Sequence, residues 1–247
     1  MTGSTWRSYD SAAGGREHVD VNGIHYRSDP LQGKAESGYD SDYGRRYLIG
    51  RVPQEDQILY HTERYHTSSF EYQLSVPDDG DYVLVLKFSE VYFDAPNKKV
   101  FSVAVNDHVV INDLDIHSRV GRAVAYDEHI PFRIEGSTIR ILDEVSDYDG
   151  VLTVRFIKGD YDNPKVNAMY VMQGELKDVP ALPPLEELEE TLPDAPEQIE
   201  LSADNLKWAS GPKQTNPYTQ QDQSQMFLPI LIALACFFPV LFCLCRL

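Results

Sequence analysis

The chain has 247 residues and 42% hydrophobic content, enough for one globular domain with some additional sequence. Its formal net charge is −17, from 39 acidic and 22 basic residues. Because phosphate binding needs basic patches, this charge argues against a nucleic-acid partner. The three cysteines, Cys236, Cys243 and Cys245, all lie near the C-terminus, so the remainder of the chain can hold no disulfide and gives no indication of its compartment.

The N-terminal segment contains no apolar run. Residues 1–17 are mostly small, polar or charged, which differs from a secretory signal peptide. We assign residues 1–13 to an N-terminal extension that lacks a signal peptide.

Residues 14–178 contain short apolar-alternating runs separated by turn residues. One pair of runs flanks Asn22-Gly23, which favours a hairpin with a type I′ turn, and a second pair flanks Asn106-Asp107. No stretch before residue 175 shows the apolar stripe of a helix. The pattern predicts an all-β domain, either a sandwich or a barrel. The expected strands are 18–21, 24–27, 82–88, 100–105, 108–111, 138–142, 151–157 and 168–172.

The composition changes near residue 179. Residues 180–200 contain seven acidic residues, five prolines and no basic residue. Such a segment repels itself and can bury little surface, so we expect residues 179–225 to form an extended acidic tether. A short leucine pattern at Leu185, Leu188 and Leu192 leaves open a contact between the tether and a partner.

A long apolar segment follows the tether. Residues 226–245 are 20 uncharged and almost wholly apolar residues, the length of a transmembrane helix, and Arg246-Leu247 would form a cytosolic end. The two prolines in the segment are tolerated in membrane helices. A buried core helix is disfavoured because no folded sequence follows it. A removable lipid-anchor signal beginning near Ala209-Ser210-Gly211 remains an alternative.

Aromatic residues beside turn residues are the main indication of function. Tyr43 lies in Ser-Asp-Tyr-Gly, Tyr92 and Phe93 precede Asp-Ala-Pro-Asn, and similar surroundings hold for Tyr60, Tyr65 and Tyr161. Aromatic rings beside carboxylates suit a sugar, because a ring covers the C–H face and a carboxylate accepts hydroxyl hydrogen bonds. The alternative is that these rings only close the edge of the core.

Motifs of other chemistries are weak or missing in this sequence. There is no glycine-rich phosphate loop, no nucleophile elbow and no metal-ligand spacing among the seven histidines. For His61 and His66, we favour the interpretation that both are solvated loop residues. Glycosidases use two carboxylates, but in so acidic a chain any pair could be proposed, among them Glu63, Glu90, Asp94 and Asp162. We therefore predict a binding protein that needs no cofactor or metal, and not an enzyme.

Several long strings then resemble one family. GGREHVDVNGIHYRSDPLQGK, EDQILYHTERY, GDYVLVLKFSEVYF, KVFSVAVNDHVVINDLDI, KGDYDNPKVNAMYVMQG and the C-terminal LFCLCRL are similar to the malectin family of endoplasmic reticulum lectins. The resemblance implies a lectin-like β-sandwich of jelly-roll type over residues 14–178. It also implies binding of α-linked glucose pairs, as in the diglucosylated high-mannose N-glycan, during glycoprotein quality control.

The resemblance assigns sugar contacts to five residues. They are Tyr43 of SDYG, Tyr65 of the TERY string, Tyr92 and Phe93 of EVYF, and Asp162 of YDNPK. The choice of Tyr65 over Tyr60 comes from the resemblance alone.

The resemblance also implies a location and a partner. Family members are single-pass type I membrane proteins with a luminal domain, working with ribophorin I of the oligosaccharyltransferase. The family's cleavable leader is not seen in residues 1–17, so we expect the native chain to extend beyond Met1, or this form to be mislocalised. Two other functions stay open: a carbohydrate-active enzyme, and an interaction protein acting through the acidic tether.

Overall fold

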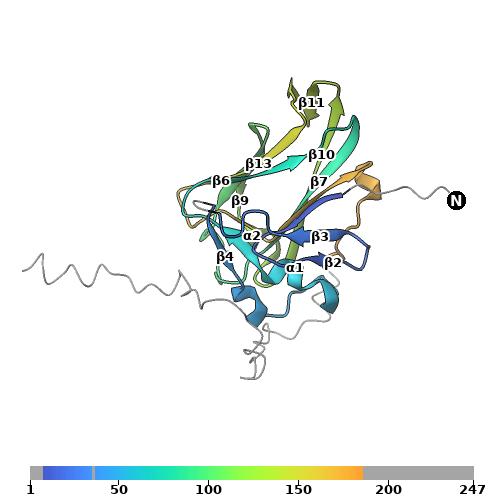
Figure 1. Ribbon diagram of the computed structural model, residues 1–247. Coiled ribbons are helices and arrows are strands. Elements are labelled where there is room, and N and C mark those ends of the chain that lie inside the picture. The colour runs from blue at the N-terminus through green and yellow to red at the C-terminus, as the bar shows by residue number, and fades with distance from the viewer. Residues whose placement is uncertain (1–7, 35–36, 186–247) are drawn as a thin grey trace, which may run out of the picture. The chain divides into compact units, whose positions relative to one another are not determined.

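The computed structural model describes residues 8–34 and 37–185 (Figure 1). Strands dominate this part of the chain, and its helices are single turns, which confirms the all-β prediction. The helical turns are α1 (Ile58–His61), α2 (Ile116–Val120) and the 3-10 turns Tyr43–Arg46, Gln54–Asp56 and Leu176–Asp178. The strands are β1 (Ser8–Ala12), β2 (His18–Val19), β3 (His25–Ser28), β4 (Tyr39–Ser41), β5 (Glu63–Tyr65), β6 (Phe70–Ser75), β7 (Gly80–Ser89), β8 (Phe101–Val105), β9 (His108–Leu114), β10 (Ala125–Glu135), β11 (Thr138–Ile141), β12 (Glu144–Asp147), β13 (Val151–Lys158), β14 (Lys165–Val166) and β15 (Ala168–Gln173).

The strands form three sheets. The large sheet has the order β12-β11-β10-β7-β15-β1-β3-β2, and a four-stranded sheet has the order β6-β13-β8-β9. A third, three-stranded sheet, β14-β5-β4, joins segments that are far apart in the sequence. In Figure 1, β6 and β13 of the four-stranded sheet cross the large sheet near β7 and β10. The predicted strands therefore exist, but their spatial order could not be read from the sequence.

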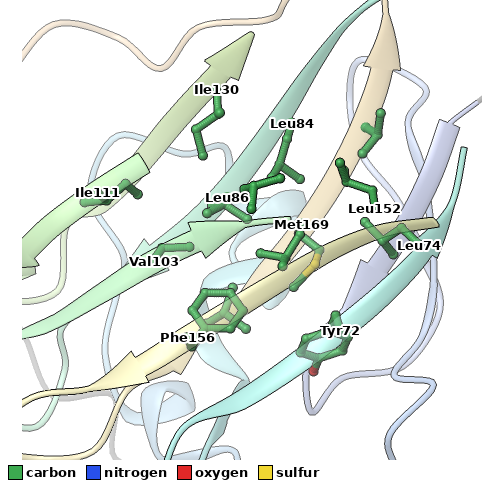
Figure 2. Packing of buried hydrophobic residues seen from close by; sticks show 14 of the residues in the cluster. Tyr72, Leu74, Leu84, Leu86, Val103, Ile111, Ile130, Leu152, Phe156 and Met169 are labelled. Carbon is green, nitrogen blue, oxygen red and sulfur yellow. The ribbon is translucent and has the colours of Figure 1, made fainter. Parts of the chain in front are cut away.

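The main core lies between the large and four-stranded sheets. Because side chains alternate along a strand, one face of β7 places Leu84 and Leu86 against Val103 of β8 and Phe156 of β13 (Figure 2). Phe156 is fully buried and stacks on Phe70, with ring centroids 5.0 Å apart. Two sheets packed over an apolar layer form a β-sandwich.

The opposite face of β7 is also buried. Val83 and Val85 contact a second apolar cluster that includes Tyr26, Leu59 and Tyr60. Short helical turns and loops, instead of another sheet, provide this cover. The seven consecutive apolar or basic residues of YVLVLKF are explained by burial on both faces.

The hairpin at Asn22-Gly23 differs from the prediction. Its strands, β2 and β3, pair as expected, but Gly23 has φ 81° and Asn22 is not in the left-handed region, so the turn is not type I′. The carboxylate of Asp20 instead accepts the backbone N–H groups of Asn22 and Ile24 at 2.9 and 2.8 Å. The hairpin at Asn106-Asp107 has both residues at positive φ, 45° and 68°, as a type I′ turn requires.

The chain after β15 continues along the second apolar cluster. Val179 and Leu182 contact this cluster, and Arg51 Nε donates to the Pro183 carbonyl at 2.8 Å. The beginning of the predicted tether is thus held by the domain as far as Pro183. No helix among residues 8–34 and 37–185 is long and apolar enough to cross a membrane. The predicted span, residues 226–245, lies outside the described residues, as does most of the tether.

Candidate functional site

Three of the aromatic residues selected from the sequence contact one another. Tyr43 begins the 3-10 turn after β4, while Tyr92 and Phe93 follow the end of β7. The ring centroids of Tyr43 and Tyr92 are 5.7 Å apart, and those of Tyr92 and Phe93 are 5.0 Å apart, both with edge-on geometry. All three side chains are half-buried, so each keeps part of its surface open to a ligand.

The position of Tyr43 depends on a close backbone approach. Ser41 Oγ accepts the Tyr43 N–H at 3.2 Å, which starts the turn. A Cβ at Gly44 would lie 2.6 Å from the His61 carbonyl oxygen, so only glycine lets this turn pack against α1. The guanidinium of Arg46 lies 4.7 Å from the centre of the Tyr43 ring, and this cation–π contact holds the ring from one side.

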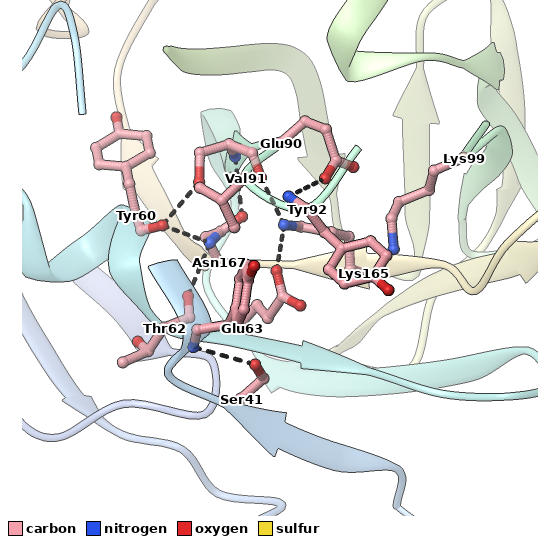
Figure 3. A network of polar contacts seen from close by, with 12 residues as sticks. Ser41, Tyr60, Thr62, Glu63, Glu90, Val91, Tyr92, Lys99, Lys165 and Asn167 are labelled. Atoms are coloured by element: carbon pink, nitrogen blue, oxygen red, sulfur yellow. Dashed lines mark hydrogen bonds and ion pairs between the residues drawn. The ribbon is translucent and has the colours of Figure 1, made fainter. Parts of the chain in front are cut away.

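A buried carboxylate fixes the Tyr92-Phe93 pair. Glu90 is 2% exposed, and its Oε1 accepts the backbone N–H of Tyr92 at 2.8 Å and of Phe93 at 3.1 Å (Figure 3). Charge-assisted bonds of this kind hold a turn more strongly than bonds between neutral groups. The sharp turn after β7 therefore carries its own internal support.

Tyr65 is placed differently from the sequence interpretation. It lies in strand β5 and not in a loop, its side chain is 1% exposed, and its ring stacks on Tyr39 at 5.5 Å between centroids. Burial raises the pKa of its hydroxyl, and Glu63 raises it further. Tyr65 offers no open ring face in this structure. Its stacking partner Tyr39 is 46% exposed and does offer one.

Asp162 completes the group of candidate residues. It lies between β13 and β14, its side chain is 20% exposed, and its Oδ2 accepts a hydrogen bond from Lys99 Nζ at 2.6 Å. Its charge, after burial and Tyr43, contributes to raising the pKa of Tyr92. Through Lys99, whose Nζ lies 5.6 Å from the centroid of the Phe93 ring, the carboxylate is linked to the aromatic residues.

A buried polar network lies beneath these residues. Lys165 Nζ donates to Glu63 Oε2 and to the Ser89 carbonyl, and both charged side chains are almost fully buried. Asn167 donates to the carbonyls of Tyr60 and Thr62 at 2.9 and 2.8 Å (Figure 3). The network ties β14 and β5 to the end of β7, so it connects the segments that carry Tyr65, Tyr92 and Asp162.

Other sequence assignments are corrected by the structure. Tyr60 is not a loop aromatic: it belongs to α1, is 1% exposed, and its hydroxyl donates to Asp127 at 2.6 Å. Tyr161, 55% exposed, remains a loop residue. His61 is half-buried rather than solvated, and its Nε2 lies 2.9 Å from the Tyr47 carbonyl oxygen.

Two further residues of the site, Tyr39 and Lys99, were missed, and Glu90 was considered only as one of several possible glycosidase carboxylates. Each of the three contacts one or two of the candidate residues directly. The signal for Glu90 was its place two residues before Tyr92, where a carboxylate can accept turn N–H groups. Nothing in the sequence distinguishes Lys99 from its neighbour Lys98, because only the fold shows which of them points inward.

A comparison with protein families shows the family of this chain. The model of the Malectin domain matches residues 8–169, more than half of the chain. This chain belongs to the malectin family. Malectin from Homo sapiens is 49% identical over 242 residues, which cover 95% of this chain and 82% of that protein. Malectin-B from Xenopus laevis is 48% identical over 241 residues, covering 95% and 86% respectively.

Solved structures resemble this malectin-family chain in fold. The ANX2 ectodomain from Arabidopsis thaliana has a TM-score of 0.57 at 14% identity, covering 72% of this chain and 52% of that chain. The chain thus spans about half the length of the ectodomain. A Bacteroides uniformis beta-glucuronidase 2 has a TM-score of 0.51 at 14% identity, covering 68% of this chain and 18% of the enzyme. At these identities the likeness shows the fold alone.

Proposed function

We propose that this protein is a carbohydrate-binding lectin for glucose-terminated α-linked oligosaccharides, of which the diglucosylated high-mannose N-glycan is the expected natural form. One observation carries the proposal: half-buried Tyr43, Tyr92 and Phe93 contact one another in a row, and Lys99 Nζ, which lies 5.6 Å from the centroid of the Phe93 ring, donates to the Asp162 carboxylate. Aromatic surfaces cover the apolar faces of sugar rings, and an ionised carboxylate accepts their hydroxyl hydrogen bonds. Membership of the malectin family supports the same function.

We further propose that the lectin works at the endoplasmic reticulum membrane with its β-domain in the lumen. The support is the apolar segment 226–245, which has the length of a membrane helix, together with the family membership. Ribophorin I of the oligosaccharyltransferase is the partner proposed from the sequence resemblance. Protease protection of microsomes tests the topology, since a β-domain digested without detergent contradicts it.

The ligand is tested by applying the detergent-solubilised full chain to a glycan array. We expect binding to glycans that end in α-linked glucose and little binding to ends that carry mannose alone. The affinity for a disaccharide should be on the order of micromolar or weaker, because a shallow site with few polar contacts gains little free energy. An array without any glucose-dependent signal overturns the proposal.

The same sample separates a lectin from an enzyme. The Glu63 carboxylate pairs with Lys165, the Glu90 carboxylate accepts backbone N–H groups, and the Asp162 carboxylate pairs with Lys99. We therefore expect no release of glucose from a bound disaccharide. Release above a denatured control, abolished by changing one of these carboxylates, would move the protein to the carbohydrate-active enzymes.

A further inference from the structure

The ammonium group of Lys99 lies at the centre of the candidate site. Its side chain is 3% exposed, and Nζ lies 2.6 Å from Asp162 Oδ2 and 3.3 Å from the Asn163 carbonyl oxygen. Nζ also lies 5.6 Å from the centroid of the Phe93 ring, within the range of a cation–π contact. One buried cation therefore contacts both the carboxylate and one of the aromatic rings of the site.

The charge of Lys99 also acts on the hydroxyl groups of Tyr65 and Tyr92. Burial raises the pKa values of Tyr65 and Tyr92, and Lys99 opposes this in both cases.

Lys99 joins two loops that meet where β8 begins and its paired strand β13 ends. It lies in the β7–β8 loop, which also carries Phe93, whereas Asp162 lies in the loop between β13 and β14. The loops also meet through their backbones, since the Asp162 N–H donates to the Lys98 carbonyl at 3.3 Å. The ion pair therefore sets the position of the carboxylate relative to the aromatic rings.

The two oxygens of the Asp162 carboxylate are used differently. Lys99 engages Oδ2, and within residues 8–34 and 37–185 no hydrogen bond to Oδ1 is found. The Asp162 side chain is 20% exposed, so part of the carboxylate group can reach a ligand. Because the charge of Lys99 compensates that of Asp162, the pair suits an uncharged hydroxyl better than an ionic ligand.

We propose that Lys99 is a positioning residue of the sugar site: it holds Asp162 Oδ2 so that Oδ1 accepts a hydroxyl of a neutral sugar packed on Phe93. The inference deepens the proposed function and rests on it. Lys99 acts through Asp162, and so the effect of removing its ammonium on sugar binding must depend on the carboxylate being present.

A double-mutant cycle measures this dependence. Binding of an α-linked glucose disaccharide to the full chain is compared for the wild type, Lys99→Met, Asp162→Asn and the double variant. We expect each single change to weaken binding roughly tenfold or more, the worth of a charged hydrogen bond. In the Asp162→Asn background, Lys99→Met should change the affinity by less than about threefold. Lys98→Met is the matched control, since Lys98 is the exposed neighbour, and it should bind like the wild type.

The outcomes separate the inference from the proposed function. Equal losses from Lys99→Met in both backgrounds, or no loss in either, overturn the positioning role while sugar binding stands. A wild type that binds no sugar overturns both. Should Lys99→Met melt far below the wild type, Lys99→Gln keeps a hydrogen-bond donor without the charge and enters the same cycle. As an independent readout, exchange of the Asp162 amide should become faster when the ammonium is removed, and unchanged exchange counts against the role.

Discussion

Lys165→Met should strongly destabilise the domain, although Lys165 is not one of the proposed sugar contacts. Lys165 is 1% exposed and donates to Glu63 Oε2 and to the Ser89 carbonyl. Methionine fills a similar volume, so the change removes the charge and both hydrogen bonds and leaves little cavity. Breaking a buried ion pair on one side costs about 3–5 kcal/mol, and the orphaned carbonyl adds about 1 kcal/mol or more.

A loss of about 4–6 kcal/mol would remove much of the stability of a domain whose total is typically about 5–15 kcal/mol. Urea unfolding followed by far-ultraviolet circular dichroism should show a much lower midpoint with an unchanged slope. The control is Lys177→Met, which breaks the ion pair between Lys177 and Glu175. Their side chains are 72% and 64% exposed, respectively. That change should stay within about 0.5 kcal/mol of the wild type. A loss below about 1 kcal/mol for Lys165→Met would refute the reasoning.

Two other predictions concern the loops of the site, and a third concerns His61 in α1. Tyr92→Ala should cost roughly 1–3 kcal/mol of disaccharide binding by calorimetry, as loss of an aromatic stacking surface does, while Tyr161→Ala, at 55% exposure, should cost little; equal losses would contradict the site. Gly159→Ala should weaken binding, because its Cβ would lie 2.7 Å from the Val100 carbonyl oxygen and separate the two loops; unchanged affinity would show that the loops tolerate the shift. Burial lowers the pKa of His61 below its usual 6.5, so its contribution to stability is complete above pH 6.5 and is lost as the pH falls below it. The melting temperature should therefore drop less between pH 7 and 5 in His61→Gln than in the wild type, and parallel curves would contradict this.

The sequence was most informative where local pattern alone decides structure. The alternation in residues 151–157 predicted β13, and Asn106-Asp107 predicted a hairpin whose turn needs positive φ at both residues. The hairpin at Asn22-Gly23 was predicted with the wrong turn, because the Asp20 carboxylate competes for the backbone N–H groups. Local propensity describes a turn only while no nearby side chain offers another hydrogen bond.

Long-range pairing could not be predicted. Arg64 and Asp29 are both buried and bond at 2.6 Å, although in sequence each reads as an exposed charge. The sheet β14-β5-β4 uses strands of two or three residues, too short for any periodicity. This sheet is the reason why Tyr65, read as a loop aromatic, is buried. The structure brings Tyr43, Tyr92, Phe93 and Asp162 together, but their role in sugar binding stays a prediction.

The position of β15 has a consequence for synthesis of the protein. In the large sheet this strand lies between β7 and β1, and without it the sheet separates into β12-β11-β10-β7 and β1-β3-β2. Ala168–Gln173 is also the last of the strands in residues 8–34 and 37–185 to leave the ribosome. The N-terminal strand β1 must therefore wait for its antiparallel partner until nearly the whole domain has been translated. During that interval the edges of β7 and β1 that later pair with β15 are open, and unpaired strand edges are prone to aggregation.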